Sequence, residues 1–213
     1  MPELFAIAGS GFGLYGYLPA LLEEIADAVV LPRAYEEKIG LRPELSRYLD
    51  RIRWAPDLDG ALGCASGVAI ASTPDRQEAL ASRCLRFDNI RRYILEKPLA
   101  PDAGSAKSLL DSMLRSGAQF RIGYTLLHAA WYEGLKARFQ KKNSIDELSI
   151  AWTFHAHHFM KNINSWKRSD SCGGGVLKFY GIQVLALLAD LGYRRVAASD
   201  TAGARPGEPE QWR

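Results

Sequence analysis

The amino-acid sequence predicts an α/β protein, with an N-terminal domain built on a parallel sheet and a truncated C-terminal α+β domain. In the first hundred residues, short apolar runs alternate with stretches of helical character, which is the pattern of βαβ units. Near residue 145 this alternation ends, and an aromatic run of extended character follows. We therefore expect domains at residues 1–120 and 121–198 and a flexible tail at 199–213, with the domain boundary within Gly117–Gly123.

The composition is that of an ordinary globular protein. Of the 213 residues, 47% are hydrophobic and 24% charged, and the net charge of +3 is spread along the chain. Without a basic block, neither nucleic acid nor a membrane surface is an expected partner. The longest apolar run, Val176–Leu191, contains Lys178 and Gln183, so we expect no membrane span. Three unevenly spaced cysteines and the lack of a leader pattern predict a cytoplasmic protein.

The elements of the first domain follow from its apolar runs. Strands are expected at Leu4–Gly9, Ala28–Leu31, Gly67–Ser72, Arg92–Leu95 and Gln119–Tyr124. Helices are expected at Tyr15–Ile25, Pro43–Arg51, Arg76–Leu85 and Asp102–Ser116, the last with a capping residue at its start.

A glycine-rich turn follows the first strand. Gly9, Gly11 and Gly13 lead into a helix, and backbone N–H groups and the helix dipole at such a turn attract a pyrophosphate. The turn residues Gly9, Ser10, Gly11, Phe12 and Gly13 are therefore candidates for binding a dinucleotide. The alternative is a tight strand–helix turn that binds no ligand.

The second domain is expected to contain few elements. We predict a helix at Trp131–Phe139, a strand at Glu147–His158, a long helix at Val176–Leu191 and a short strand at Tyr193–Ala198. The glycines before the long helix, Gly173–Gly175, are either an anion site or a hinge for close approach. So small a sheet is barely stable alone and exposes an edge, so we expect a homodimer through the strand Glu147–His158.

Four motifs in order give the chain a family resemblance. They are the glycine turn, the run Ser72-Thr73-Pro74, the run Glu96-Lys97-Pro98-Leu99, and Trp166-Lys167-Arg168 followed by Gly173–Gly175. With these motifs the chain resembles the Gfo/Idh/MocA family of NAD(P)-dependent oxidoreductases, which includes glucose–fructose oxidoreductase and inositol dehydrogenase.

The resemblance implies a Rossmann domain that binds NAD or NADP, and hydride transfer on a sugar- or cyclitol-like substrate. It places Ser72, Thr73, Pro74, Glu96, Lys97 and Pro98 beside the cofactor, in addition to the glycine turn. Lys97 would also be catalytic, through a hydrogen bond to the reacting hydroxyl. Pro98 would follow a cis peptide bond.

The chain departs from the family pattern at positions that matter for chemistry. The family's aspartate and histidine on the helix after the triple glycine correspond here to Phe179 and Gln183, which do not move protons. The second strand ends at Arg33, where an acidic residue would bind the ribose hydroxyls, so Arg33 is a candidate for contacting the 2′-phosphate of NADP. An alternative function follows: a non-catalytic dinucleotide-binding or assembly protein.

Three histidines, His155, His157 and His158, are candidates for the missing proton donor. On a strand His155 and His157 share a face, and their spacing suits zinc, but no third ligand follows, so we expect no metal. If that face lines the substrate cleft, His157 acts as the acid/base, because the pKa of histidine lies near neutrality. The alternative is a set of polar residues on a half-exposed sheet.

Overall fold

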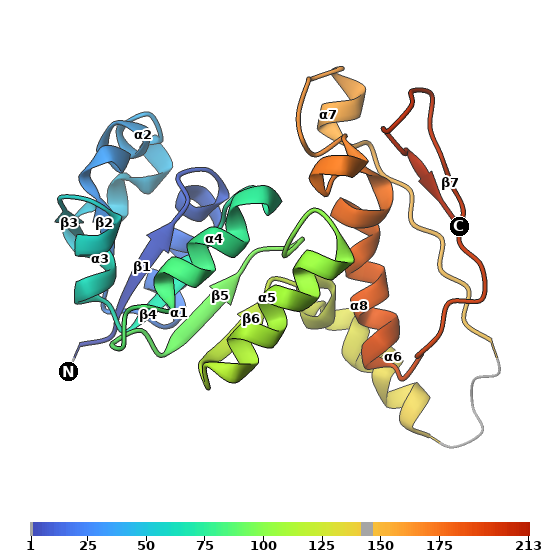
Figure 1. Ribbon diagram of the computed structural model, residues 1–213, viewed down its shortest axis with the longest axis horizontal. Coiled ribbons are helices and arrows are strands. Elements are labelled where there is room, and N and C mark those ends of the chain that lie inside the picture. Colours follow the sequence, from blue (N-terminus) through green and yellow to red (C-terminus); the bar gives the residue numbers. More distant parts are fainter. Residues whose placement is uncertain (1, 142–146) are drawn as a thin grey trace. The chain divides into compact units, whose positions relative to one another are not determined.

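A computed structural model describes residues 2–141 and 147–213 of the chain. The chain divides into two compact units, Met1–Gly123 and Tyr124–Arg213, which Figure 1 colours from blue to green and from yellow to red. The division falls at the end of Gly117–Gly123, the segment in which the sequence places the boundary.

The first unit contains a six-stranded parallel sheet. Its strands are β1 (Leu4–Ala8), β2 (Ala28–Pro32), β3 (Ile52–Ala55), β4 (Gly67–Ile70), β5 (Arg92–Leu95) and β6 (Gln119–Ile122), in the order β3-β2-β1-β4-β5-β6 (Figure 1). This confirms the predicted α/β class. The chain adds strands outward from β1 in one direction up to β3 and then in the other direction from β4 to β6, so the strand order reverses at β1. The last residues of β1 and β4, Ala8 and Ile70, lie opposite each other, so the two strands end at the same level.

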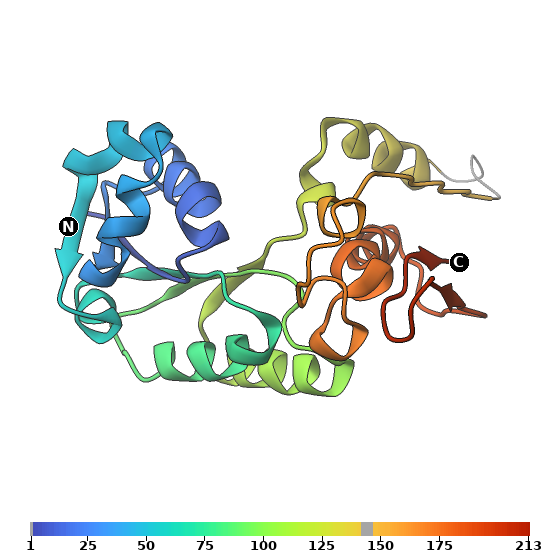
Figure 2. The same cartoon turned by 90° about the horizontal axis from the view of Figure 1, so that it is seen from above.

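Helices cover both faces of this sheet. Successive side chains of a strand point to opposite faces, so each face carries its own hydrophobic core, and helices bury each core. Ala6 and Ala8 belong to one core and Phe5 and Ile7 to the other. The first core is closed by α3 (Leu58–Cys64), α4 (Pro74–Cys84) and α5 (Ala103–Arg115). The second is closed by η1 (Gly13–Tyr17), α1 (Leu18–Glu24), α2 (Glu36–Gly40) and η3 (Pro43–Arg51), and Figure 2 shows the two layers on opposite sides of the sheet.

One βα unit, formed by β3 and α3, was not predicted from the sequence. The strand β3 is short and lies at the edge of the sheet, where Arg53 is exposed, so its apolar signal is weak. The helix α3 contains Gly60 and Gly63, which lower its helix propensity. The predicted helix Pro43–Arg51 is present, although it is a 3-10 helix.

The second unit consists mainly of helices. These are η4 (Thr125–His128), α6 (Ala130–Gln140), α7 (His157–Met160), η5 (Asp170–Cys172), η6 (Val176–Gly181) and α8 (Ile182–Asp190). They confirm the helices predicted at Trp131–Phe139 and Val176–Leu191, the second of which begins as the π-helix η6.

Two predicted strands of the second unit are wrong. In place of the strand Glu147–His158, the described chain is irregular up to Ala156 and then forms α7. Tyr193–Ala198 is also irregular. Alternating aromatic residues favour a strand, but a strand forms only where another backbone supplies its hydrogen bonds, and no ladder forms here among the described residues.

The segment after Ser199 is ordered, contrary to the predicted flexible tail. It forms an antiparallel ladder of β7 (Thr201–Ala202) and β8 (Gln211–Trp212). Its Trp212 ring lies against Gly181, where an added Cβ would come within 2.9 Å of the ring. We call this segment, residues 199–213, the C-terminal clasp.

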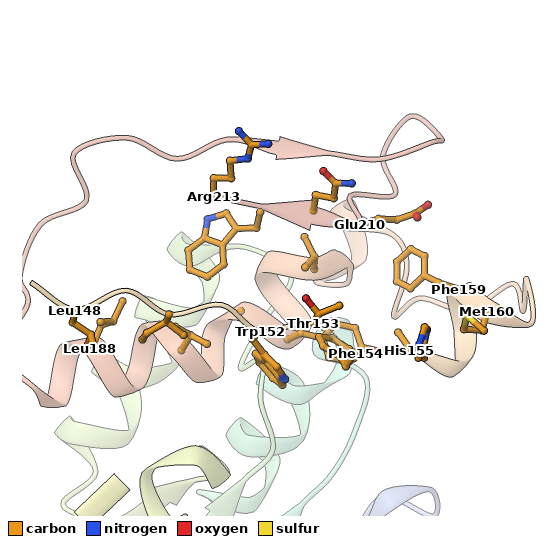
Figure 3. A pocket seen from close by; sticks show the side chains of 18 residues that line it. Leu148, Trp152, Thr153, Phe154, His155, Phe159, Met160, Leu188, Glu210 and Arg213 are labelled. Atoms are coloured by element: carbon orange, nitrogen blue, oxygen red, sulfur yellow. The ribbon is translucent and has the colours of Figure 1, made fainter. Parts of the chain in front are cut away.

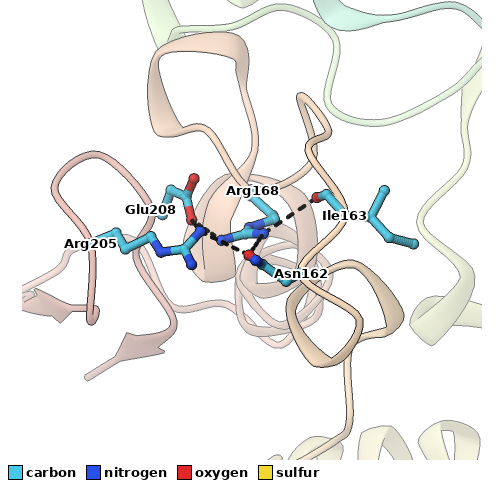
Figure 4. A network of polar contacts seen from close by, with 5 residues as sticks. All are labelled: Asn162, Ile163, Arg168, Arg205 and Glu208. Carbon is cyan, nitrogen blue, oxygen red and sulfur yellow. Dashed lines mark hydrogen bonds and ion pairs between the residues drawn. The ribbon is translucent and has the colours of Figure 1, made fainter.

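A buried arginine fixes the C-terminal clasp to the rest of the second unit. Arg168 is 5% exposed, forms an ion pair with Glu208 and donates to Asn162 Oδ1 at 2.9 Å (Figure 4). Arg205 donates to the same Asn162 oxygen at 2.8 Å. Although most of the clasp is exposed, its glycines and prolines lie in turns joined by a backbone ladder, and composition alone does not distinguish such turns from disorder.

By length and composition alone, the helical stretch Asp170–Asp190 is long and apolar enough to cross a membrane, with a mean hydropathy of 1.5 in its most apolar window. Gln183, Val184 and Leu187 on this stretch are buried within the second unit. Over the most apolar window of the stretch, 39% is buried within the structure.

Candidate functional site

The predicted cofactor-binding residues gather at one edge of the sheet in the first unit. In a parallel sheet all strands end at the same edge, and here Gly9–Gly13 follow β1, Arg33 follows β2, Ser72–Pro74 follow β4 and Glu96–Pro98 follow β5. The strand order reverses between β1 and β4, and ligands of open α/β sheets bind outside the strand ends at such a point.

Two glycines of the turn are required by packing. Gly9 has φ +139°, and a Cβ at this position would lie 2.0 Å from the Ala71 carbonyl oxygen. A Cβ at Gly13 would lie 2.7 Å from Ile7 Cγ2. These glycines let the turn pack closely against the ends of β1 and β4.

Gly11 is different, because the space beside it is open. A Cβ at Gly11 would meet no atom within 4 Å. Among the described residues, the backbone N–H groups of Ser10, Gly11 and Phe12 make no hydrogen bond, and a helix begins at Gly13. Unbonded amides at the start of a helix fit the diphosphate of a dinucleotide.

The segment after β2 contacts the glycine turn through residues that the sequence analysis missed. The Gly9 N–H donates to the Tyr35 hydroxyl at 3.1 Å, and Lys38 Nζ donates to Ser10 Oγ at 2.6 Å. Arg33 is exposed and forms an ion pair with Glu36 at 3.6 Å. Tyr35 and Lys38 could have been found by their place, because residues after the second strand of this fold contact the ribose of the cofactor.

The Glu96-Lys97-Pro98 loop is fixed through its backbone. The Lys97–Pro98 peptide bond is cis, as predicted. Gln77, a fully buried residue of α4, donates through Nε2 to the carbonyl oxygen of Glu96 and, at 3.3 Å, to that of Pro98. Both carbonyls next to the lysine are thus held by one side chain.

Glu96 connects this loop with the helix after the glycine turn. The Tyr17 hydroxyl donates to Glu96 Oε2 at 2.8 Å. Burial raises the pKa of Tyr17 strongly, and the negative charge of Glu96 raises it further. Tyr17 is therefore protonated at neutral pH and remains the donor in this bond.

The predicted proton donor His157 belongs to the second unit. It is an exposed residue at the start of α7, and its ring meets that of His158 edge-on at 6.0 Å. Burial lowers the pKa of His158, and the positive charges of Lys167, His157 and Arg168 lower it further. Because no strand forms here, the predicted shared face of His155 and His157 is wrong. Among the described residues, His, Cys, Asp and Glu do not gather in any group suited to a metal ion.

Phe179 and Gln183 are both packed. The Phe179 ring meets the Trp166 ring at 5.2 Å and lies 5.3 Å from Lys167 Nζ. Gln183 is 6% exposed, and its Oε1 accepts from the Leu126 N–H at 3.4 Å. These contacts give both side chains structural roles within the second unit.

The triple glycine is a close-packed turn and does not form an anion site. The N–H groups of Gly173, Gly174, Gly175 and Val176 donate to the carbonyls of Asp170, Ser169, Lys167 and Pro209, respectively. A Cβ at Gly174 would lie 2.2 Å from the Trp166 carbonyl oxygen. The amides that could hold an anion are already used by the backbone.

The second unit also contains a cavity of about 730 Å³ with a mixed apolar and polar lining (Figure 3). The irregular segment lines one side with Trp152, Phe154 and His155, α8 contributes Leu188, and the C-terminal clasp contributes Glu210 and Arg213. In place of the predicted strand, an irregular segment lines this cavity.

The chain matches no protein-family model and no curated protein sequence. Among solved structures it is similar to GenD2 from gentamicin A biosynthesis in complex with NAD, with 19% identity and a TM-score of 0.72 over 99% of this chain and 61% of that one. It is also similar to the WlbA dehydrogenase from Thermus thermophilus in complex with NAD and UDP-GlcNAcA, with 19% identity and a TM-score of 0.70 over 96% of this chain and 67% of that one.

A third similar structure is a super-repressor mutant of Gal80p from Saccharomyces cerevisiae, with 14% identity and a TM-score of 0.71 over 100% of this chain and 61% of that one. The solved structures that the chain resembles are of the Gfo/Idh/MocA type, so the predicted resemblance is confirmed at the level of the fold. The chain spans about three fifths of the length of most of these structures.

Proposed function

We propose that the protein binds NAD or NADP at the glycine turn and takes part in hydride transfer on a sugar-like hydroxyl or ketone. The observation that carries this proposal is the turn Ser10–Phe12, whose amides make no hydrogen bond among the described residues at the point where the strand order reverses. Two similar structures are described as complexes with NAD, which supports the choice of ligand.

The protein's own groups have distinct roles in this proposal. The amides of Ser10, Gly11 and Phe12 bind the diphosphate, and the cofactor supplies or accepts the hydride. Lys97, at the end of β5, donates a hydrogen bond to the oxygen of the reacting carbon and stabilises negative charge there. His157 remains the candidate for the proton transfer that Phe179 and Gln183 do not perform.

A second candidate function is non-catalytic, and the packing of the second unit favours it. Phe179 and Gln183 are engaged in aromatic contacts and in a buried hydrogen bond, and neither carries an exchangeable proton for catalysis. The likeness to a structure described as a super-repressor mutant of Gal80p also supports this candidate. In that case the first unit binds the dinucleotide and the second contacts a partner protein.

Titration with NADH and NADPH, followed by fluorescence or calorimetry, tests the shared part of both candidates. Binding of either supports it, and no binding to either contradicts it. Turnover with a panel of sugars and cyclitols then separates the two candidates.

If the protein is an enzyme, Lys97→Met is expected to lower turnover by about 10²–10⁴-fold while the cofactor affinity stays the same. If the wild type and the Phe179→Asp/Gln183→His variant bind cofactor and turn over no substrate, the non-catalytic candidate is favoured.

A further inference from the structure

The Glu96–Pro98 loop is bound by the buried side chain of Gln77 and the half-buried side chain of Tyr17, which come from other elements. Gln77 on α4 donates to the carbonyls of Glu96 and Pro98, and Tyr17, after the glycine turn, donates to the Glu96 carboxylate. The Glu96 N–H continues the ladder of the sheet through the Ile70 carbonyl at 2.9 Å. The backbone around Lys97 is therefore held by α4 and β4, and the neighbouring Glu96 side chain is held by η1.

The hydrogen bonds of Gln77 are unusual for a purely structural side chain. Gln77 is fully buried, yet its Oε1 has no hydrogen-bond partner, so the residue bears the cost of a buried unmet acceptor. An apolar side chain of the same size would avoid that cost, but it would leave the carbonyls of Glu96 and Pro98 without this donor. The amide of Gln77 supplies a donor that binds the carbonyls of Glu96 and Pro98, the two residues on either side of Lys97.

Tyr17 extends the same arrangement to the proposed cofactor turn. Its hydroxyl is kept protonated by burial and by Glu96, so it donates to that carboxylate at any neutral pH. Tyr17 belongs to η1, the helix that begins at Gly13 directly after the turn. Tyr17 therefore connects the helix after the turn to Glu96, the residue directly before Lys97.

We infer that Gln77 and Tyr17 are positioning residues for Lys97: Gln77 holds the loop that carries the lysine, and Tyr17 couples that loop to the glycine turn. This inference rests on the proposed function for the chemistry of Lys97. The geometry that it uses lies wholly within the first unit.

The test follows the Lys97 side chain itself, so it requires no substrate. The lysines of the full chain are ¹³C-dimethylated, the Lys97 NMR signal is assigned by its loss in Lys97→Arg, and NADH and NADPH are added in turn. In the wild type the Lys97 signal is expected to differ from that of exposed lysines and to shift on addition of either cofactor.

Two variants separate positioning from simple stability. Gln77→Met keeps the volume and removes the donor, and Tyr17→Phe removes only the hydroxyl. We expect Gln77→Met to move the Lys97 signal toward that of exposed lysines. We expect Tyr17→Phe to reduce the shift of the Lys97 signal on addition of cofactor. The melting temperatures of both variants are expected to lie within about 5 °C of that of the wild type. Glu78→Leu, an exposed change on the same helix, is expected to leave both quantities unchanged.

An unchanged Lys97 signal and response in folded Gln77→Met and Tyr17→Phe would overturn the inference. If Gln77→Met does not fold, the test of Gln77 passes to Gln77→Leu, which also fills the buried site with a side chain that has no donor. If the wild type binds neither cofactor, the proposed function fails, and the coupling of Tyr17 to a cofactor turn is rejected with it. The Lys97 signal measured without cofactor still decides whether Gln77 positions the lysine.

Discussion

At the scale of single residues, the three glycines of the first turn have separate roles that their common spacing hides. Gly9 has a positive φ, and a Cβ there would collide with the Ala71 backbone; a Cβ at Gly13 would collide with Ile7, and one at Gly11 would meet open space. Packing therefore requires the outer two, and a ligand would require the middle one.

This division predicts opposite outcomes for two substitutions. Gly9→Ala is expected to destabilise the first unit by about 3 kcal/mol or more, because its Cβ meets a carbonyl and its φ is strained. Gly11→Asp is expected to fold normally and to weaken dinucleotide binding by about tenfold or more, because a carboxylate would face the phosphates. Urea unfolding and fluorescence titration measure the two effects. Unchanged affinity in a folded Gly11→Asp protein would place the diphosphate elsewhere.

The residues after β2 predict a preference for NADPH over NADH. No acidic side chain occurs between Pro32 and Tyr35 to bind the ribose hydroxyls, and Arg33 and Lys38 supply positive charge instead. Arg33→Ala and Lys38→Ala are each expected to weaken NADPH binding about tenfold and NADH binding less than about twofold. Arg115→Ala, at the end of α5, is the matched control. Equal losses for both cofactors would show that these cations do not contact the 2′-phosphate.

At the scale of elements, the most consequential ion pair joins the C-terminal clasp to the loop before the long helix. The Arg168 side chain is 6% exposed and that of Glu208 27% exposed, and Arg168 Nε has no hydrogen-bond partner. The guanidinium therefore depends on Glu208 and Asn162 to compensate its burial.

Glu208→Ala is expected to lower the free energy of unfolding of the second unit by about 2–3 kcal/mol. This is less than for a fully buried pair, because Glu208 keeps partial contact with water. Glu210→Ala, the same change at an exposed position of the clasp, is expected to have little effect. Chemical denaturation of both variants measures the difference. Equal stability of the two would mean that Arg168 finds other partners.

The elements also show how far a sequence can predict this molecule. Buried parallel strands such as β1 and β4 are apolar throughout, so their positions and the glycine turn between strand and helix could be predicted. Glu147–His158 could not, because its extended pattern says nothing about whether another backbone pairs with it. Gln77 and Tyr17 were missed for a related reason: their roles depend on carbonyls and a carboxylate that lie 19–79 residues further along the chain.

At the scale of the whole molecule, the homodimer expected from the sequence stays a prediction. Its original basis, a strand at Glu147–His158, is absent, but Ile150, Trp152 and Phe154 in that segment are 43%, 45% and 36% exposed. Large side chains exposed together are typical of a surface that contacts another protein.

We therefore expect a dimer at micromolar concentration in sedimentation velocity. Trp152→Ser/Phe154→Ser is expected to shift it toward monomer, because it removes aromatic area from the contact. Leu41→Ser, which removes an exposed apolar side chain from the first unit, is the control and is expected to leave the dimer intact. A wild-type protein that sediments as a monomer at these concentrations would exclude the dimer.

The C-terminal clasp has a practical consequence for anyone who works with the protein. Pro209 accepts the N–H of Val176 at the start of the long helix, and Trp212 lies against Gly181 one turn or so further on. An expression boundary drawn at Ala198, where the composition suggests that order ends, would uncover the core helix of the second unit. Insolubility of a chain shortened at that point would therefore reflect the cut rather than the fold.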